Sequence, residues 1–123
     1  MPRTLHAQHH RFPLTRPFRI ARGVKSFADV VTVTVSEGGF EGRGEGVPYP
    51  RYGESVESAL AEIESARAAV EAGAGREALQ ALLTPGAARN AVDCALWDLE
   101  ARRSGRDVAA LLGLPPAGPL VSA

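Results

Sequence analysis

The stretch FEGRGEGV, residues 40–47, places glycine at every second position: Gly42, Gly44 and Gly46. Alternation of this kind is typical of a β-strand, in which successive side chains point to opposite faces of a sheet. One face of this strand would therefore carry almost no side chains, and glycine inside a strand often marks a close approach by another backbone. We expect another segment to pack closely against this bare face.

The residues before this stretch also predict strands. ADVVTVTVSEGG, residues 28–39, alternates valine with threonine or serine and ends in the turn residues Glu37-Gly38-Gly39. The valines predict a buried face, the hydroxyl side chains an exposed face, and the turn an antiparallel return into residues 40–47. TLHAQHHRFPL, residues 4–14, predicts the first strand of the same sheet.

The remainder of the chain predicts helices. Ser55 is placed to cap a helix that ends near Gly73, and residues 76–83 form a second, shorter helical pattern. Thr84 as N-cap, with Pro85 in the first turn, predicts a third helix that runs to Gly105. Residues 107–113 add one or two turns before LPPAGPLVSA, whose LVSA resembles the beginning of a strand.

The third predicted helix is apolar on nearly every side. A helix of this kind has to be covered all round. Because a three-stranded domain of this size offers little material for that, we expect part of the helix to face a partner or a further domain. Its apolar residues are Ala87, Ala88, Ala91, Val92, Cys94, Ala95, Leu96, Trp97, Leu99 and Ala101.

Composition narrows the class of protein. The 123 residues correspond to about one domain, and 14 basic side chains balance 14 acidic ones, which gives no indication of nucleic-acid or membrane binding. No run of apolar residues is long enough for a transmembrane helix. The single cysteine, Cys94, cannot form an internal disulfide, so we expect a reducing, cytoplasmic location.

Two motifs that could carry chemistry have ordinary explanations. On a strand, His9 and His10 point to opposite faces, while His6 and His10 share a face about 13 Å apart, so the three cannot bind one metal ion without a bulge in the strand. GRGEGV, residues 42–47, lacks the third glycine of a dinucleotide-binding loop.

The acidic residues of the third helix also have a structural interpretation. Asp93 lies four residues after Arg89, and Asp98 lies four residues before Arg102. This is the spacing at which side chains meet on a helix surface, so we favour internal ion pairs over a catalytic role.

Two connecting segments are rich in chemistry. Residues 15–27 carry four cations that could bind a carboxylate or be solvated, and spacing alone leaves both open. Residues 44–55 combine prolines with tyrosines, an arginine and glutamates, which slightly favours a binding loop. The side chains concerned are Arg16, Arg19, Arg22 and Lys25 in the first segment, and Glu45, Tyr49, Arg51, Tyr52 and Glu54 in the second.

Three segments together resemble the N-terminal domain of the enolase superfamily, in its mandelate racemase and muconate cycloisomerase-like branch. They are PFRIARG (17–23), GRGEGVPYPRYGES (42–55) and AARNAVDCALWDLEARRSG (87–105). Within that branch they look most like dipeptide epimerases of the L-Ala-D/L-Glu type, isomerases of cell-wall peptide metabolism. The resemblance implies an α+β capping domain over residues 1–113, a three-stranded antiparallel meander followed by a helical bundle. Residues 114–123 would be a linker and the start of the first barrel strand.

The same resemblance implies that catalysis takes place elsewhere. In similar enzymes a TIM barrel supplies three carboxylates for Mg²⁺ and lysines on opposite faces of the substrate, which move the α-proton of the second residue of the dipeptide. A barrel needs about 200 residues or more, and Lys25 is the only lysine of this chain. We therefore expect no catalytic residue, no metal ligand and no bound cofactor here, and interpret the chain as part of a longer, Mg-dependent enzyme.

By the resemblance, residues 16–27 and 46–54 would close over the mouth of the barrel. Arg22 or Lys25 would then face a carboxylate of an acidic dipeptide, while Tyr49, Arg51 and Tyr52 would shape the pocket wall. The helix that carries Trp97 would pack toward the barrel.

Other interpretations remain open. Cycloisomerases and o-succinylbenzoate synthases share the same capping domain. A stand-alone α+β binding module for an acidic ligand would need no barrel, and a degenerate domain could simply support an oligomer. The expected partners are the acidic dipeptide and the chain's own barrel; formation of a homo-oligomer stays open.

Overall fold

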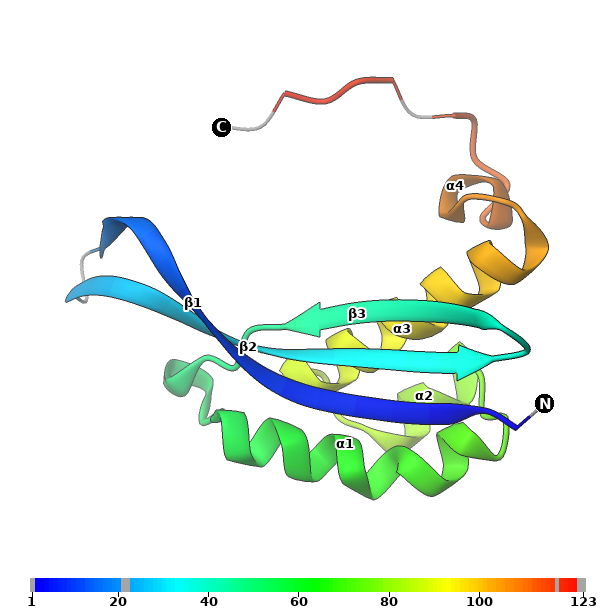
Figure 1. Ribbon diagram of the computed structural model, residues 1–123, viewed down its shortest axis with the longest axis horizontal. Helices are drawn as coiled ribbons and strands as arrows, with labels where there is room; N and C mark the ends of the chain where they lie inside the picture. The colour runs from blue at the N-terminus through cyan, green and yellow to red at the C-terminus, as the bar shows by residue number, and fades with distance from the viewer. Residues whose placement is uncertain (1, 21–22, 117, 122–123) are drawn as a thin grey trace.

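The computed structural model describes residues 2–20, 23–116 and 118–121. Its three strands form one antiparallel sheet in the order β1-β2-β3, with helices packed on one face (Figure 1). The predicted α+β architecture, a meander followed by helices, is confirmed, and the described residues contain no barrel. The elements are β1 (Thr4–Ile20), β2 (Gly23–Glu37), β3 (Phe40–Gly46), the 3₁₀-helix η1 (Pro50–Tyr52), α1 (Val56–Glu71), α2 (Arg76–Leu82), α3 (Ala87–Ser104) and α4 (Val108–Leu111).

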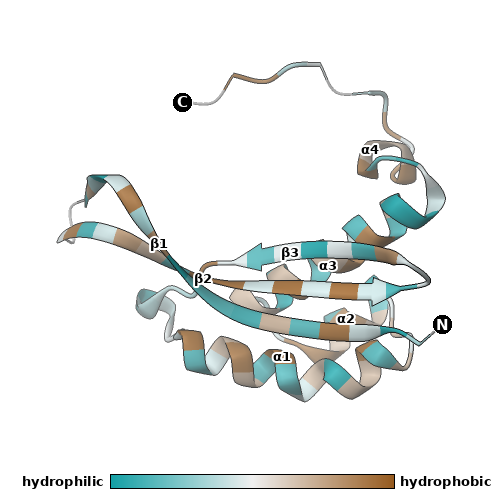
Figure 2. Cartoon of the chain, in the orientation of Figure 1, coloured by the Kyte–Doolittle hydropathy of each residue, from teal (hydrophilic) through white to brown (hydrophobic). Residues whose placement is uncertain are grey.

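The central strand β2 divides the sheet into a buried and a partly exposed face. Val31, Val33 and Val35 are fully buried, whereas Thr32 and Thr34 on the other face are half-buried. Apolar and polar bands alternate along β2 in Figure 2. The predicted alternation is therefore confirmed, and the valines form the centre of the core together with α1 and α3.

The glycine face of β3 lies beside these valines, and α3 packs directly against it. Gly42, Gly44 and Gly46 pair directly with the three buried valines of β2, so they face the same side of the sheet. A Cβ atom at Gly44 would overlap the carbonyl oxygen of Ala91 and would lie 2.7 Å from the amide nitrogen of Ala95. Equivalent atoms at the other two glycines would also collide with the α3 backbone. The expected close approach is confirmed, and its partner is α3.

This close contact covers more of α3 than the sequence suggested. The chain itself buries seven of its residues, so most of the helix is covered from within, and the expectation that the remaining part faces a partner or a further domain stays a prediction. Arg76 of α2 also lies over the Trp97 ring, 3.3 Å from its centroid. Cys94 is exposed. The buried residues are Ala87, Ala88, Ala91, Val92, Ala95, Leu96 and Leu99.

Polar contacts anchor α3 to β3 and to the end of α2. Asp98 accepts a hydrogen bond from the backbone nitrogen of Arg43 in β3 at 2.8 Å and one from Arg102 at 3.1 Å. The predicted Asp98–Arg102 pair is thus confirmed. The Arg89–Asp93 pair is not among the ion pairs of the described residues; Arg89 instead donates to the carbonyl oxygen of Leu83 at 3.5 Å.

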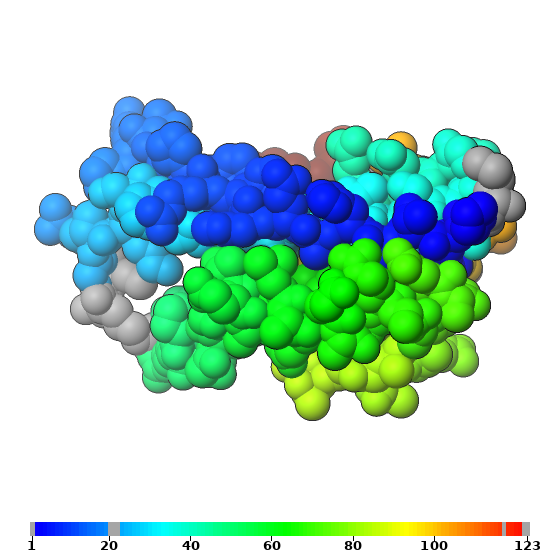
Figure 3. All heavy atoms as spheres, turned by 60° about the horizontal axis from the view of Figure 1, so that its bottom comes forward, coloured from blue at the N-terminus to red at the C-terminus, as the bar shows by residue number. Residues whose placement is uncertain are grey.

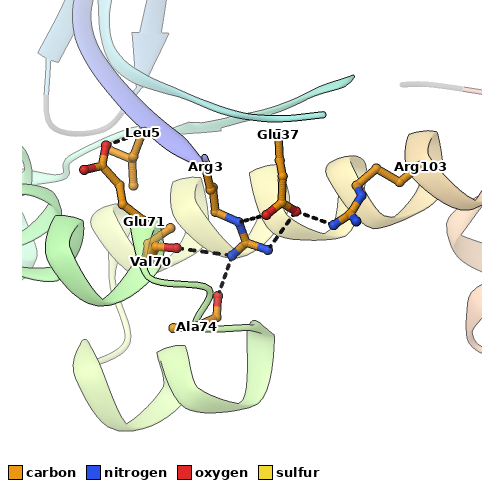
Figure 4. Close-up of polar contacts among 7 residues, drawn as sticks. All are labelled: Arg3, Leu5, Glu37, Val70, Glu71, Ala74 and Arg103. Carbon is orange, nitrogen blue, oxygen red and sulfur yellow. Dashed lines mark hydrogen bonds and ion pairs between the residues drawn. The ribbon is translucent and has the colours of Figure 1, made fainter. Parts of the chain in front are cut away.

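A nearly buried arginine ties the sheet to the helix ends at the edge of the core (Figure 4). Arg3 donates to the carbonyl oxygen of Val70 in the last turn of α1 at 3.3 Å and to that of Ala74 just beyond the helix at 2.9 Å, and it pairs with Glu37 of β2. Glu37 also pairs with Arg103 of α3. Cations are favourable near helix C-termini, where carbonyl groups lack partners. This cluster holds the end of the sheet opposite the segments that the resemblance assigns to a lid.

The segment between the first two predicted strands is not a loop. β1 and β2 continue beyond the core as a two-stranded antiparallel ribbon, called here the arm (residues 11–20 and 23–29; Figure 1). The register shifts between Pro13 and Phe18, and pairing then resumes as Phe18 with Lys25. Proline lacks an N–H for the ladder, which accounts for the interruption. The prolines and cations of this segment suggested a loop, but cross-strand pairing overrides that preference.

The end of the chain leaves the core. After α4, residues 114–116 and 118–121 have no regular secondary structure, and Leu120 and Val121 are almost fully exposed. The proposed division at residue 113 stays a prediction. Within the described residues no helix combines the length and apolar character needed to cross a membrane.

The packing of β3 on α3 predicts a strong effect of adding a single methyl group. Gly44→Ala should lower the free energy of unfolding by about 3 kcal/mol or more, because the new Cβ meets backbone atoms that cannot move independently. Urea denaturation followed by circular dichroism measures this. Gly75→Ala, which enters open space at the start of α2, should cost less than about 1 kcal/mol. Equal losses in the two variants would contradict the packing argument.

Candidate functional site

A cavity of about 700 Å³ lies between the arm and the segment that follows β3. The arm contributes Phe18, Lys25 and Phe27 to its walls, and the opposite side is formed by Val47, Pro48 and Pro50. Figure 3 shows the arm and the beginning of α1 at the same end of the molecule. The walls are mainly apolar, with one lysine among these six residues, so the cavity suits a ligand that has both an apolar part and an anionic group.

Lys25 lines this cavity, and two further predicted site residues, Tyr49 and Tyr52, lie beside it without lining the wall themselves. Nζ of Lys25 is 5.3 Å from the centroid of the Tyr49 ring, within the range of a cation–π contact. The rings of Tyr49 and Tyr52 have centroids 5.4 Å apart and are inclined by 56°. The arm and the segment after β3 are therefore in contact through a cation and an aromatic pair.

The other two predicted residues are placed differently. Arg51 is exposed on η1 and does not line the cavity. Arg22 lies outside the described residues, so its role stays a prediction. Of the cations expected in this segment, the structure therefore places Lys25 and Arg16 at the cavity wall.

Sequence reasoning missed a charged cluster at the base of the arm. Asp29 lines the cavity and accepts hydrogen bonds from Nε and Nη2 of Arg11 at 2.8 and 3.2 Å. Nε2 of His9 lies 2.8 Å from the same carboxylate. The hydrogen bonds from Arg11, and to a smaller extent the contact with His9, lower the pKa of Asp29 below its usual value of 3.8. Only the strand register, which pairs Arg11 with Asp29, brings these residues together.

The cluster also orders an aromatic side chain of the arm. The guanidinium carbon of Arg11 lies 4.0 Å from the centroid of the Phe27 ring, which lines the cavity. Arg11 thus contacts a carboxylate and a ring at once, which restricts its own conformations and those of both partners.

The segment after β3 is attached to the beginning of α3 by Glu54. The sequence predicted Thr84 and Pro85 at this helix end, but α3 begins at Ala87, and its N-cap, Gly86, has no side chain to accept a hydrogen bond. Glu54 accepts from the backbone nitrogen of Ala87 at 2.7 Å instead. The expected local cap is therefore replaced by a carboxylate that lies 33 residues earlier in the chain.

Two observations concern metal binding and thiol chemistry in the described residues. These residues include no group of three or more His, Cys, Asp or Glu side chains arranged to hold a metal ion, so the Mg²⁺ of the family does not fit this part of the protein. Partial burial, with the nearby charge of Asp93, raises the pKa of the Cys94 thiol, which disfavours the reactive thiolate. The site as described can bind and orient a ligand.

Comparison with known proteins identifies the domain. The family model of the mandelate racemase / muconate lactonizing enzyme, N-terminal domain, matches residues 3–113. The chain belongs to this family. The resemblance inferred from the three sequence segments, to the capping domain of enolase-superfamily dipeptide epimerases, is thereby confirmed.

Individual relatives show which enzymes of this family the chain is similar to. The chain is 52% identical over 112 residues to the L-Ala-D/L-Glu epimerase of Escherichia coli K12, a match that covers 91% of this chain and 35% of that enzyme. An enolase family member from Agrobacterium tumefaciens with homology to dipeptide epimerases was solved with sodium and L-Ala-L-Glu. It has a TM-score of 0.88 and 54% identity, over 93% of this chain and 35% of that chain.

A more distant relative binds a different dipeptide. The dipeptide epimerase from Methylococcus capsulatus, complexed with Mg and L-Arg-D-Lys, has a TM-score of 0.77 and 30% identity, over 92% of this chain and 35% of that chain. The chain therefore spans about one third of the length of these relatives.

The Asp29 cluster predicts a measurable titration. The pKa of Asp29 is lower in the folded state than in the unfolded state. The stability that the contacts of Asp29 with Arg11 and His9 provide should therefore be fully present above the unfolded-state pKa, and it should be lost as pH falls through the folded-state pKa. Carbon NMR of the Asp29 carboxyl should give a midpoint below 3.8. Arg11→Gln should raise that midpoint, whereas Arg43→Gln, which removes an exposed pair with Glu41, should leave it unchanged. A wild-type midpoint at or above the usual value would refute the assignment.

Proposed function

We propose that this chain is the N-terminal capping and substrate-specificity domain of a dipeptide epimerase that acts on acidic dipeptides of the L-Ala-D/L-Glu type. The observation that carries the proposal is the 52% identity to the Escherichia coli epimerase over 91% of the chain. The relative from Agrobacterium tumefaciens, solved with L-Ala-L-Glu, supports the same substrate class.

In this proposal the cavity recognises the substrate while another part of the protein performs the reaction. The reaction is removal and return of the α-proton of the second residue, and Mg²⁺ would act in a barrel domain beyond the 123 residues. Residues 114–123 would connect the two domains. The relatives, which are about three times as long as this chain, leave room for such a domain. We also infer a cytoplasmic enzyme of cell-wall peptide metabolism.

The charge of the cavity favours an acidic substrate. Lys25 and Arg16 place two cations at the wall, while the carboxylates of Asp29 and Glu54, which also line the cavity, already accept hydrogen bonds from Arg11 and from backbone nitrogens. The cations are therefore free of intramolecular pairs with these two carboxylates and could meet a carboxylate of the substrate. The chain is also more similar to the relative solved with L-Ala-L-Glu than to the one solved with L-Arg-D-Lys.

The direct test is proton exchange in the complete protein. In deuterated buffer with Mg²⁺, L-Ala-L-Glu should lose the proton signal at the α-carbon of its glutamate, and L-Ala-D-Glu should accumulate. The 123-residue chain alone should give no exchange. If the complete protein exchanges no dipeptide but converts a cycloisomerase or o-succinylbenzoate synthase substrate, the alternative within the branch is correct.

Replacing the cavity lysine should weaken binding of an acidic dipeptide selectively. Lys25→Met in the complete enzyme should raise KM for L-Ala-L-Glu about tenfold, the loss of one charge-assisted contact, and should change KM for a dipeptide with a neutral second residue much less. Arg43→Met, on the exposed part of β3 away from the cavity, is the matched control and should leave both KM values unchanged. Unchanged KM values for Lys25→Met and Arg22→Ala would exclude these two cations from carboxylate recognition.

A further inference from the structure

We propose that Glu54 is a positioning residue that holds residues 47–53, the segment that carries the cavity-wall residues Val47, Pro48 and Pro50, in their binding geometry. Its carboxylate joins this segment to the N-terminus of α3. The inference rests on the proposed function for the identity of the ligand, but the contacts that carry it belong to this chain alone.

Both oxygens of the Glu54 carboxylate accept hydrogen bonds from backbone nitrogens. One accepts from Ala87 at 2.7 Å, and the other accepts from Tyr49 at 3.3 Å. The backbone nitrogen of Glu54 in turn donates to the carbonyl oxygen of Tyr49 at 3.3 Å. Residues 49–54 thus form a closed loop that is fastened to a helix by one side chain.

The beginning of α3 is shaped to receive this carboxylate. Gly86 has φ +159°, and a Cβ atom there would lie 3.0 Å from the Glu54 oxygen that contacts Ala87. The absence of a side chain therefore leaves room for Glu54. The first N–H groups of a helix lack internal partners and carry partial positive charge, so an acceptor with full negative charge is favourable here.

The same helix also holds the other end of the segment. The side-chain amide of Asn90 donates to the carbonyl oxygen of Glu45 at 3.1 Å. Gly46 lies directly against the Ala87 backbone. Residues 47–53 are therefore clamped at both ends by the first turns of α3, with Val47, Pro48 and Pro50 facing the cavity between the two clamps.

Tyr49 connects this clamp to the ligand-binding side chains. Its backbone nitrogen is held by Glu54, and its ring contacts Lys25 and Tyr52. A shift of the loop would therefore move the ring against which the cavity lysine lies. Glu54 also lines the cavity, but both of its oxygens are engaged by backbone nitrogens, so we infer that it acts on ligand binding through Tyr49.

The test compares Glu54→Gln with Glu71→Gln in the complete enzyme. The amide group of glutamine would point an N–H donor at one of the two backbone donors, so one contact has to break. Glu71 provides the matched control, because it also accepts from a backbone nitrogen, that of Leu5 at 2.9 Å, but lies by the core at the Arg3 end of α1. The readouts are kcat and KM for L-Ala-L-Glu, and amide hydrogen exchange of residues 47–53.

Glu54→Gln should raise KM about tenfold with kcat within about twofold, and residues 47–53 should exchange at least about tenfold faster. Glu71→Gln should change neither quantity. If Glu54→Gln does not fold, Glu54→Asp replaces it, because the shorter side chain keeps the charge but cannot reach both backbone nitrogens.

Three results would overturn the proposal: unchanged exchange in residues 47–53, faster exchange with unchanged KM, or an equal rise of KM in Glu71→Gln. The second result would make Glu54 a purely structural cap. If the wild-type complete protein has no epimerase activity, the proposed function fails, and the exchange data alone then decide whether Glu54 holds the loop.

Discussion

The close contact between the backbones of β3 and α3 is the constraint on which the rest of this structure depends. Three glycines of β3 face Ala87, Ala91 and Ala95 of α3 at distances that leave no space for a Cβ atom. This contact buries the apolar side of the helix without outside material and fixes the height of the helix above the sheet. It also brings the first turn of α3 to the place where β3 ends, and the cavity wall begins there.

The two walls of the cavity are held by different forces. Residues 47–53 are clamped at both ends by α3, so their position follows from the packing of the core. The arm projects beyond the core with exposed Phe18 and Phe27 and is held by cross-strand pairing and by the cluster around Asp29. A fixed wall and a projecting arm, joined by Lys25 and Tyr49, form an arrangement suited to a lid that recognises a ligand and excludes water.

In the proposed function, the described residues recognise the substrate and another part of the protein performs the reaction. The described residues bring together a cation, two aromatic rings and apolar walls, yet they include no group suited to hold a metal ion. Membership of the mandelate racemase / muconate lactonizing enzyme N-terminal domain family gives this separation a simple explanation, because the relatives are about three times longer. In the proposed function, selectivity for an acidic dipeptide depends on this domain, and proton transfer depends on the remainder of the protein.

Features that depend on neighbouring residues could be determined from the sequence by itself: the alternation of β2, the bare face of β3, the Ser55 cap of α1 and the end of α3 at Gly105. Side-chain periodicity and local backbone preferences decide such features. The sequence also identified Lys25, Tyr49 and Tyr52 as candidates, but not how they meet. Only the tertiary structure decided that the arm is a ribbon, that Asp29 pairs with Arg11 and His9, and that Glu54 rather than Thr84 caps α3. These contacts join residues far apart in the chain, and they exist only because strand register and the packing of β3 on α3 bring those residues together.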